Sequence, residues 1–292
     1  MFQDFVKAYS KVYQSQQEKT RRFQIFAENV ERARKLQEAE RGTAKYGVTK
    51  FSDLSEDEMK GGTFLTDSSL KCDPSHYSNH NKDLPNSKDW RKDKSVTDVK
   101  DQGSSCKACW AFAVVANVES QWAIKTKVLA SLSTQEVLDC SQAGNCSGGR
   151  IGHALRSIVN TGLMDEDSYR YTGRIGACRR NENKIMVRIK RCVSLKIDEV
   201  AMKEYVALNG TITALVNLKG LQNYKRGILR SNCPSTPTDH AVLIVGYGTE
   251  ADLPFWIVKN SWGTDWGEDG YIRIFRGENT CGIQNHTMSV TV

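Results

Sequence analysis

Two cysteines in C-x-x-C spacing, Cys106 and Cys109, lie in the stretch SCKACWAF at positions 105–112. Such a pair can form a redox dithiol, supply half of a zinc site, or combine one structural cysteine with one reactive cysteine. A zinc site needs a second pair of ligands at comparable spacing, and Cys140 and Cys146 are six positions apart. A thioredoxin-like dithiol needs a strand directly before the motif, whereas DVKDQGSS at 98–105 is typical of a loop. Both alternatives stay open but are less favoured, and we expect neither a metal nor a cofactor.

The reactive-cysteine interpretation makes Cys109 a nucleophile at the start of a helix. The mostly apolar stretch from Cys109 to Lys127 predicts a buried helix, and a helix N-terminus favours an anion and so lowers a thiol pKa. A thiolate also needs a base, and His240 lies 131 positions later, at the start of the apolar run HAVLIVGYG. An imidazole needs an orienting group, and Asn260 lies 151 positions after Cys109 in VKNSWGTDWG. These three residue types in this order predict nucleophilic catalysis.

Seven stretches of the chain occur in the order in which the papain family of cysteine proteases has them. They are LPNSKDWR, KDQGSSCKACWAF, LSTQEVLDC, CSGGRIGHA, TDHAVLIVGYG, KNSWGTDWGEDGYIRI and NTCGI. The chain therefore resembles a papain-family proenzyme, most closely of the cathepsin F branch, over essentially all of its 292 residues. The resemblance implies an α+β fold of two domains, helical on the left and β-barrel-like on the right, with the active-site cleft between them and a helical propeptide in front.

The resemblance also implies a role for each catalytic residue. Cys109 Sγ would attack the scissile carbonyl as a thiolate, and His240 would hold that thiolate and protonate the leaving amine. Asn260 would orient the imidazole, and Trp262 would shield their hydrogen bond from water. The Gln102 side chain and the Cys109 backbone N–H would form the oxyanion hole. The implied activity is that of a cysteine endopeptidase whose substrates are proteins and peptides.

The residues that match the family's substrate groove include both backbone and pocket positions. The backbone of a substrate would pair with a wall at Gly148 and Gly149, while a pocket for the P2 side chain would form further along the groove. The substrate-binding positions implied in the pocket and beside it are Ile151, Leu215, Asp239, Ala241 and His286. An aliphatic pocket would prefer an aliphatic or aromatic P2 residue. His286 would point to solvent or pack, or else, protonated in acid, it would admit an acidic side chain.

The resemblance implies three disulfides among the nine cysteines: Cys106–Cys146, Cys140–Cys178 and Cys233–Cys281. Apart from Cys109, it leaves Cys72 and Cys192 without a family partner. Cys192 lies on a predicted strand, so we expect a buried, inert thiol there. Cys72 lies in a polar stretch, so we expect an exposed thiol that could pair with another molecule.

The chain divides into an N-terminal extension and a larger body. Residues 1–60 have a helical pattern, 61–83 are polar and turn-rich, and all six tryptophans lie beyond residue 83. We expect an inhibitory propeptide at 1–60 and, at 61–83, a linker that contains the activation cleavage. The peptidase would cover 84–292, with a mostly helical half at about 84–185 and a mostly β half at about 186–292.

Two prosegment motifs of the family match the N-terminal extension. The helical motif, in the variant with alanine and glutamine that is associated with the cathepsin F and W branch, matches Glu18, Arg22, Phe26, Asn29, Ala33 and Gln37. The second motif matches Gly47, Phe51 and Asp53. Between and after these motifs, KYGVTKFSDLSEDEM predicts a short strand before another helix, with Ser55 and Glu58 as a capping box.

The resemblance further implies how the zymogen is controlled. The propeptide would dock on the sheet half, and the linker would pass through the cleft in reverse orientation and block attack. In acid, carboxylates such as Asp53 would become protonated and docking would weaken. Cleavage at 72–84 would then release a mature enzyme that starts close to Leu84.

Two departures from the family pattern lie beside Cys109. Seven positions separate Gln102 from Cys109, where the family usually has six, and Lys107 stands where the family usually has glycine. The extra residue could displace Gln102 and hurt catalysis, so the alternative is a catalytically impaired homologue that acts as a binding or regulatory protein. Lys107 would be a solvated charge, or it would stabilise the thiolate or bias the groove toward acidic residues.

Composition argues against two classes of partner. The net charge of +7 is spread out, and its densest cluster, RIKR at 188–191, contains no aromatics, so we expect no nucleic-acid binding. The chain has no apolar run near the roughly 20 residues that span a bilayer, so we expect no membrane span. Its start is not a signal peptide, and we expect one to have been removed. The resemblance implies a lysosomal or secreted monomer that cystatin-like inhibitors could bind.

Overall fold

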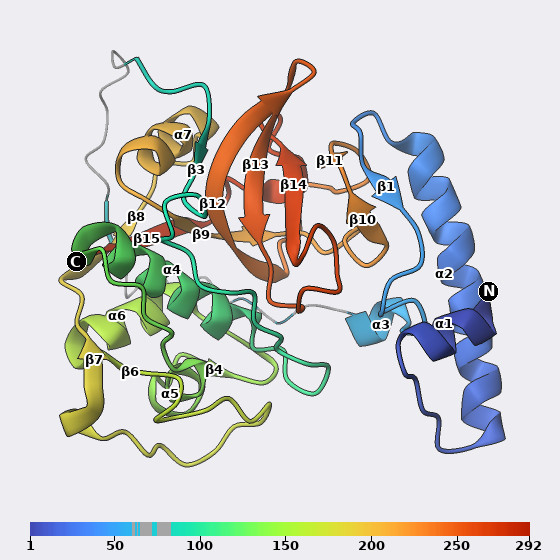
Figure 1. Cartoon of the computed structure of the whole chain (residues 1–292), viewed down its shortest axis with the longest axis horizontal. Coiled ribbons are helices and arrows are strands. Elements are labelled where there is room, and N and C mark those ends of the chain that lie inside the picture. The colour runs from blue at the N-terminus through green and yellow to red at the C-terminus, as the bar shows by residue number, and fades with distance from the viewer. Residues whose placement is uncertain (60–61, 63, 65–71, 75–82) are drawn as a thin grey trace.

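The computed structural model describes residues 1–59, 62, 64, 72–74 and 83–292, which form an α+β fold. Figure 1 shows three parts: a helical N-terminal segment, a sheet in the centre, and a group of helices on the other side. Most of the expected linker at 61–83 lies outside the described residues. None of the helices among the described ranges is long and apolar enough to cross a membrane.

The N-terminal segment (residues 1–59) contains three helices and a short strand. They are α1 (Phe2–Ala8), α2 (Gln16–Ala39), β1 (Lys45–Tyr46) and α3 (Glu56–Met59). Ser15 caps the N-terminus of α2, since its side chain accepts a hydrogen bond from the Glu18 N–H, while the Glu18 carboxylate accepts from the Gln14 N–H. The predicted capping box before α3 is confirmed, because the Ser55 and Glu58 side chains each accept from the other's backbone N–H.

The helical part packs around one apolar helix. Its elements are α4 (Cys109–Thr126), α5 (Thr134–Cys140), β4 (Gly144–Asn145), β5 (Gly148–Gly149), α6 (Ile151–Thr161), β6 (Leu163–Met164), η1 (Glu182–Lys184) and β7 (Ile185–Val187). The buried helix predicted from Cys109 is confirmed, since most α4 side chains are shielded from solvent. α4 ends at Lys127, whose left-handed conformation (φ 65°) stops the helix.

The sheet part is built from short strands and one helix. Its elements are β2 (Asp73–Pro74), β3 (Lys88–Asp89), β8 (Arg191–Ser194), α7 (Glu199–Leu208), β9 (Ile212–Val216), β10 (Tyr224–Arg226), β11 (Ile228–Leu229), β12 (His240–Glu250), β13 (Leu253–Lys259), β14 (Tyr271–Phe275), η2 (Thr280–Gly282) and β15 (Thr287–Thr291). Nine of the strands form one sheet in the order β11-β14-β13-β12-β9-β15-β8-β2, with β3 beside β12. This pairing is an open path, so the domain implied to be barrel-like is not a closed barrel among the described strands.

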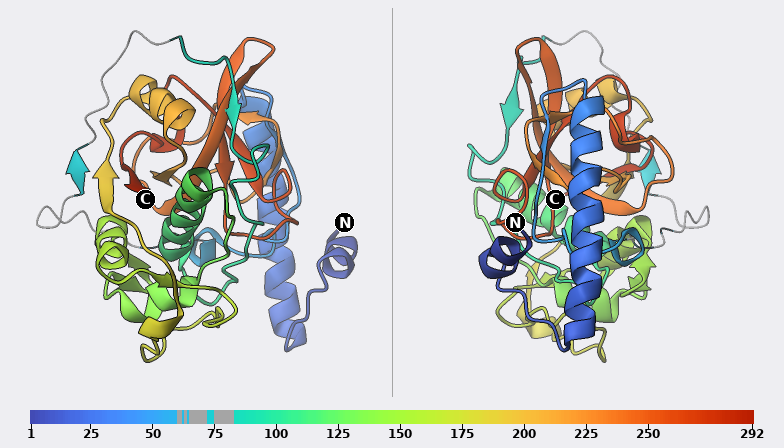
Figure 2. Two further views of the ribbon diagram at one scale, coloured as in Figure 1. Left: turned by 60° about the vertical axis from the view of Figure 1, so that its left-hand side comes forward. Right: turned by 90° about the vertical axis from the view of Figure 1, so that its right-hand side faces the viewer.

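The N-terminal segment is attached to the sheet part by strand pairing. β1 lies antiparallel to β10, with Lys45 opposite Arg226 and Tyr46 opposite Tyr224. The Gly47 N–H donates to the carbonyl of Asn223 at 2.9 Å, which continues the contact beyond the strand. Figure 2 shows α2 running across this side of the molecule. The predicted packing of this N-terminal segment on the sheet half is therefore confirmed.

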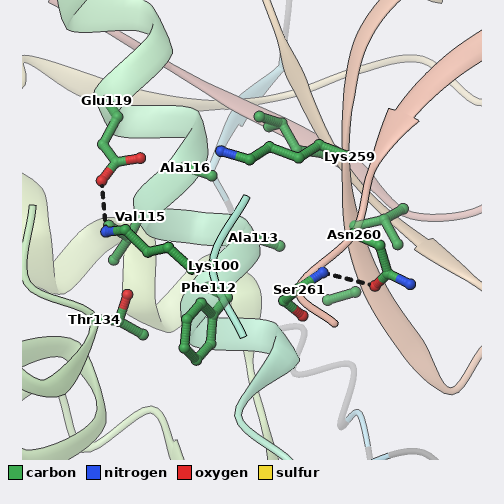
Figure 3. Close-up of a pocket in the computed structure, with 13 residues that line it drawn as sticks. Lys100, Phe112, Ala113, Val115, Ala116, Glu119, Thr134, Lys259, Asn260 and Ser261 are labelled. Carbon is green, nitrogen blue, oxygen red and sulfur yellow. Dashed lines mark hydrogen bonds and ion pairs between the residues drawn. The ribbon is translucent and has the colours of Figure 1, made fainter. Parts of the chain in front are cut away.

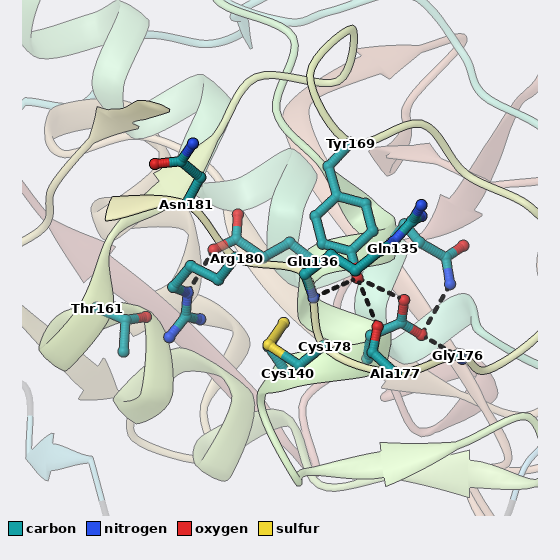
Figure 4. Close-up of a disulfide and its surroundings, with 12 residues drawn as sticks. Gln135, Glu136, Cys140, Thr161, Tyr169, Gly176, Ala177, Cys178, Arg180 and Asn181 are labelled. Carbon is teal, nitrogen blue, oxygen red and sulfur yellow. Dashed lines mark hydrogen bonds and ion pairs between the residues drawn. A yellow bond between two sulfur atoms is a disulfide. The ribbon is translucent and has the colours of Figure 1, made fainter. Parts of the chain in front are cut away.

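Four disulfides staple the structure, and three of them are the pairs that the resemblance implies: Cys106–Cys146, Cys140–Cys178 and Cys233–Cys281. The bond between Cys140 and Cys178 lies beneath a polar network (Figure 4). In this network the Tyr169 hydroxyl donates to an Asp139 carboxylate oxygen at 2.8 Å, and Arg180 pairs with Glu136 at 2.7 Å. The staple and the network together hold the chain between α5 and β7.

Cys192 is buried on a strand, as predicted, but the expectation that it and Cys72 are free thiols was wrong, because the two form the fourth disulfide. β2 lies parallel to β8, which places Cys72 beside Cys192 with their Cα atoms 5.0 Å apart, within the range of a disulfide. Cys72 is buried rather than exposed, at 2% of its free surface. Cys109 is therefore the one cysteine of the nine that is free.

Candidate active site

Cys109 is the first residue of α4, and it is almost completely buried. No side chain caps this helix end. The Ala111 N–H donates to the Ala108 carbonyl at 2.8 Å, so the N–H groups of Cys109 and Trp110 are the ones at this end that face an anion. Burial nevertheless raises the pKa of the Cys109 thiol to about 11, more than backbone hydrogen bonds at Ala241 and Trp110 lower it. The expected lowering of this pKa is thus not found here, since burial outweighs the helix end.

His240 begins β12, and its ring lies against the residues that follow β13. The imidazole Nε2 and Asn260 Oδ1 are 2.7 Å apart, and the same Oδ1 accepts from the Ser261 N–H at 2.8 Å. Because a carbonyl oxygen only accepts, Nε2 carries the proton and Nδ1 is left as an acceptor. Trp262 covers this pair, with its ring centroid 4.9 Å from that of His240. Burial lowers the pKa of His240 to about 4, although the Asn260 hydrogen bond opposes the shift.

Gln102 is held in place by Ser261. Its side-chain oxygen accepts from the Ser261 hydroxyl at 2.7 Å, and its backbone N–H donates to the Ser261 carbonyl at 2.9 Å. The Gln102 amide nitrogen donates to the Cys106 carbonyl at 3.5 Å. Because this nitrogen carries two hydrogens, one is left for another acceptor. The amide donor therefore remains available beside Cys109.

The extra residue between Gln102 and Cys106 is absorbed in an exposed turn. Gly103 has φ +70°, and a Cβ there would meet no atom within 4 Å, so the turn projects into solvent. The Ser105 hydroxyl donates to the Gly173 carbonyl at 3.2 Å and secures the far side of the turn. Gln102 and Cys106 remain buried on either side. The insertion therefore does not expel Gln102 from the site.

Four of the expected catalytic side chains line one cavity of about 60 Å³: Gln102, Cys109, His240 and Trp262. Lys107 also lines this candidate cavity, while its backbone N–H donates to the Cys146 carbonyl at 3.0 Å. Asn260 reaches the cavity only through His240. Four residues of the N-terminal segment, together with Gly62, also line the cavity. The four are Phe51, Leu54, Glu58 and Met59.

The N-terminal segment covers the candidate cavity with specific contacts. The Phe51 ring lies edge-on to Trp262, with centroids 4.9 Å apart. Lys50 Nζ binds two carboxylates of the main body, Asp101 at 2.7 Å and Asp265 at 2.8 Å. These contacts hold the N-terminal segment over the cavity that Cys109 and His240 line.

The second motif and the helical motif of the N-terminal segment are linked by hydrogen bonds. Asn29 Nδ2 donates to the carbonyls of Ser52 and Leu54 at 2.9 and 2.8 Å. Asp53 is buried and accepts from Lys11 at 2.8 Å and from the Tyr13 hydroxyl at 3.0 Å. The other motif positions also lie in this segment. Glu18 and Arg22 lie on one face of α2, and Phe26 and Ala33 are buried. The Gln37 side chain donates to the Ala44 carbonyl and accepts from the Tyr46 N–H.

The expected groove residues fall into two groups. Gly148 and Gly149 form β5, and Gly62 lies so close that a Cβ added to it would be 2.9 Å from Gly148 Cα. The backbone at Gly62 therefore covers part of the wall where substrate is expected. The Trp110 ring lies directly behind Gly149, where an added Cβ would meet it at 2.5 Å.

The pocket residues lie in one apolar cluster. Ile151, Leu215 and Ala241 belong to it, and the Phe64 side chain packs against the same cluster. His286 is half-buried, and burial lowers its pKa. Its backbone carbonyl accepts from the Leu215 N–H at 3.1 Å, so this residue adjoins the cluster.

Asp239 has a structural contact of its own. Its carboxylate accepts from the Leu218 N–H at 2.9 Å, and Leu218 lines the candidate cavity. The Asp239 charge also contributes, after burial, to the raised pKa of Cys109. The structure thus places Asp239 beside the site through a loop contact.

Asn260 and Ser261 also line a second cavity of about 20 Å³, which the sequence does not predict (Figure 3). Lys259 Nζ donates to the Thr97 carbonyl at 2.7 Å, and burial lowers the pKa of this amine to about 8. Glu119 of α4 accepts from the Thr97 hydroxyl at 2.5 Å and from Lys100 at 2.9 Å. A lysine inside the apolar run PFWIVK directly before Asn260 was the available signal. This network anchors the end of β13.

The described residues contain no group of three or more His, Cys, Asp or Glu side chains that could hold a metal ion. Cys106 is bonded to Cys146, so neither sulfur is free to coordinate metal or to form a dithiol with Cys109. The arrangement can instead perform nucleophilic chemistry, with a thiol, an imidazole and an amide donor around one cavity.

Two family models match the chain. One, described as papain family cysteine protease, matches residues 84–291, and the other, described as cathepsin propeptide inhibitor domain (I29), matches residues 2–59. Among curated proteins, the chain is 41% identical over 302 residues to cathepsin F of Mus musculus, covering 100% of this chain and 64% of that protein. The chain thus spans less than two thirds of that relative. It is 39% identical over 296 residues to the viral cathepsin of Choristoneura fumiferana nuclear polyhedrosis virus, covering 99% of this chain and 90% of that protein.

Solved structures of proenzymes resemble the whole chain. Digestive procathepsin L2 proteinase from the Tenebrio molitor larval midgut superposes with a TM-score of 0.92 at 32% identity, covering 100% of this chain and 98% of that one. Recombinant stem bromelain precursor superposes with a TM-score of 0.89 at 33% identity, covering 100% of this chain and 97% of that one.

Proposed function

Because this chain belongs to the papain family of cysteine proteases and carries a cathepsin propeptide inhibitor domain, we propose that it is the zymogen of an acid-activated cysteine endopeptidase of the cathepsin F type. The observation that carries the proposal is the position of the one free cysteine. Cys109 stands at a helix N-terminus and shares a cavity with His240 and Gln102.

In the proposed reaction, the Cys109 thiolate attacks the scissile carbonyl and a tetrahedral oxyanion forms. The Gln102 side chain and the Cys109 N–H donate to this oxyanion. The C–N bond breaks as the His240 imidazolium gives its proton to the leaving amine. Water, deprotonated by His240, then attacks the thioester, the C–S bond breaks, and the acid product leaves with the Cys109 thiolate and the His240 imidazolium restored. Asn260 holds the ring throughout, at the 2.7 Å contact described above.

The same geometry supports a reason for latency. With the propeptide in place, burial raises the pKa of Cys109 to about 11 and lowers that of His240 to about 4, so both groups are neutral between these values. Release of Phe51, Leu54 and Met59 admits water to the cavity. Both pKa values then move back toward their ordinary range, and the thiolate–imidazolium pair becomes accessible. Latency in this account is both steric and electrostatic.

The finer features of the proposal follow from the family pattern. The propeptide covers 1–60, the linker 61–83 contains the cleavage, and the peptidase starts near Leu84 with halves at about 84–185 and 186–292. The apolar side chains at the pocket positions Ile151, Leu215 and Ala241 favour an aliphatic or aromatic P2 residue. The enzyme would act as a lysosomal or secreted monomer, with cystatin-like proteins as inhibitors. The impaired-homologue alternative is not favoured, because the inserted residue leaves Gln102 in the cavity.

Replacing Ser261 with alanine is expected to lower kcat/KM by about fivefold. The serine hydroxyl fixes the Gln102 amide, and one hydrogen bond is worth about 1 kcal/mol, which is close to a fivefold change in rate. Because the amide donates to the oxyanion, the loss should appear in kcat more than in KM. Steady-state kinetics of the activated variant measure this split. A change in KM alone would assign Ser261 to substrate binding instead.

Replacing Gly42 with alanine is expected to weaken propeptide inhibition by about tenfold or more. An alanine Cβ at this position would lie 2.2 Å from the Ile228 carbonyl oxygen of the main body, so the docked strand must shift. Activity should then appear at a higher pH than in the unaltered protein. The measurement is the onset of peptide hydrolysis as the pH is lowered in steps.

Gly47→Ala is the matched control for this prediction, although Gly47 belongs to the second propeptide motif. Its added Cβ would meet only Lys225 Cγ, at an ordinary 3.7 Å, so inhibition should hardly change. If both alanine variants lost inhibition equally, chain stiffness rather than the clash with Ile228 would be the cause.

Loss of the ion pair between Glu58 and Arg22 in acid is expected to lower the stability of the folded propeptide. Burial raises the pKa of Glu58, but hydrogen bonds from Arg22 and Ser55 outweigh it and hold that pKa below its ordinary 4.5. A lowered carboxyl pKa stabilises the fold fully above pH 4.5 and loses that effect as pH falls through the folded-state value. Glu58→Gln should therefore reduce the pH dependence of thermal unfolding in this range. An unchanged dependence would mean that other carboxylates govern release.

The proposed function is tested by shifting the full-length protein to about pH 5 in the presence of dithiothreitol and following hydrolysis of a fluorogenic Leu-Arg peptide. Activity should appear together with a product that starts near Leu84. A protein that keeps its full-length mass and stays inactive would contradict the zymogen proposal.

A further inference from the structure

The disulfide between Cys72 and Cys192 joins the activation region to the body of the enzyme. Cys72 lies between the parts of the chain matched by the propeptide and peptidase models, which end at residue 59 and begin at residue 84. Cys192 lies in β8, well inside the peptidase match. The bond therefore crosses the boundary at which the zymogen is proposed to be cut.

This disulfide lies in an ordered strand pair. β2 runs parallel to β8 with Asp73 opposite Val193 and Pro74 opposite Ser194, and Figure 2 shows the two short arrows side by side. The next pair in this register is Cys72 and Cys192 themselves. On its other side, Cys192 lies opposite Val290 of β15. β2 thus forms an edge strand of the main sheet, with Cys72 directly before it.

The surroundings of the two sulfurs are apolar. Cys72 is 2% exposed and Cys192 is 4% exposed, and both belong to the cluster that contains Val290. The Ser194 hydroxyl also reaches the Cys72 carbonyl, at 3.4 Å. Covalent, backbone and apolar contacts therefore all hold Cys72 to β8.

We propose that the Cys72–Cys192 disulfide keeps the propeptide covalently attached to the enzyme after activation cleavage, and that a thiol reductant completes its release. The proposal rests on the zymogen function above. A single cut between Pro74 and Leu84 separates two chains in sequence, but the piece that ends beyond Pro74 remains bonded to Cys192. Acid weakens docking without removing this tether.

A tether changes how inhibition behaves. A piece held by a short connection has an effective concentration of about millimolar, so dilution does not remove it from the cleft. A small thiol ends this state by exchange. Its thiolate attacks one sulfur, the S–S bond breaks with release of the other cysteine as a thiol, and a second thiol resolves the mixed disulfide. Two thiols are oxidised to one disulfide, while Cys72 and Cys192 are each reduced.

The position of the bond also sets when exchange occurs. A reductant reaches the buried sulfurs when the two-residue edge strand β2 opens locally. Complete activation therefore needs both acid and a reducing compartment. In an oxidising medium the cleaved enzyme remains a disulfide-linked, inhibited pair of chains.

The test uses full-length Cys109→Ser protein with a recognition sequence for a site-specific protease placed between Pro74 and Leu84. Without the catalytic thiol, self-cleavage is absent, and added reductant cannot act through Cys109. After cutting, non-reducing mass spectrometry is expected to show both pieces in one species, and dithiothreitol should separate them. The same protein with Cys72→Ser and Cys192→Ser should separate in acid without reductant.

Peptide mapping of the uncut, unreduced protein provides a second measurement that does not depend on the variants folding. It should find Cys72 joined to Cys192. The proposal would be overturned if the cut propeptide separated in acid without reductant and iodoacetamide alkylated both Cys72 and Cys192, because both would then be free thiols. A different partner for either cysteine would also overturn it. Because no turnover is measured, failure here is separate from failure of the proposed peptidase function.

Discussion

Replacing Cys109 with serine is expected to lower kcat/KM for peptide hydrolysis by about 10⁴-fold or more, while the protein still folds. A serine hydroxyl is far less acidic than a thiol, so His240 cannot generate a comparable anion from it. Cys109 forms no disulfide, so the exchange removes none of the four staples. The measurement is hydrolysis of the same peptide by protein that has been freed of its propeptide.

Ser120→Ala in the same helix is the matched control for this loss. Ser120 is fully buried in α4, and its hydroxyl has no hydrogen-bond partner within the described part of the chain. Its removal should leave kcat/KM nearly unchanged and the fold intact. Retention of substantial turnover by Cys109→Ser would exclude Cys109 as the nucleophile. Equal losses in both variants would indicate damage to α4 rather than to the chemistry.

Replacing Gln102 with alanine is expected to lower kcat/KM by about 10²–10³-fold, with most of the change in kcat. The amide is the donor left free by Ser261, and it borders the cavity that contains Cys109. Alkylation of Cys109 by a small reagent should persist, because Gln102 stabilises the oxyanion rather than the thiolate. Steady-state kinetics and the rate of alkylation, measured on the activated variant, separate the two effects.

Ser105→Ala is the control for the inserted turn. Its hydroxyl bonds to the Gly173 carbonyl at an exposed position, so kcat/KM should change a few-fold at most. If Ser105→Ala lost as much kcat/KM as is expected for Gln102→Ala, the turn rather than the Gln102 amide would limit catalysis. If Gln102→Ala instead retained its activity, the oxyanion would be bound by other donors.

The sequence predicts the fold and the candidate site well where motifs are local. The apolar run after Cys109 predicts α4, and the capping box at Ser55 and Glu58 predicts the start of α3. The family pattern identifies His240 and Asn260, which lie 20 positions apart. In the structure, His240 Nε2 and Asn260 Oδ1 are 2.7 Å apart. These features are readable because each depends on short stretches with a recognisable order.

What the sequence did not predict depends on contacts between distant residues. The Cys72–Cys192 pairing spans 120 positions, and connectivity cannot be deduced from cysteine positions alone. The raised pKa of Cys109 arises from burial, which outweighs the lowering expected from the helix N-terminus. Lys259 reaches Thr97 across 162 positions to anchor β13 behind Asn260. Each of these effects is tertiary and has no local signature.

The most direct test of the central claim is active-site titration of the acid-activated protein with an epoxide inhibitor, followed by turnover per titrated site. We predict that one equivalent labels Cys109 and abolishes hydrolysis of the Leu-Arg peptide, so that activity extrapolates to zero at full labelling. Full labelling of Cys109 in a protein that never hydrolysed the peptide would contradict the account and identify the chain as an impaired homologue.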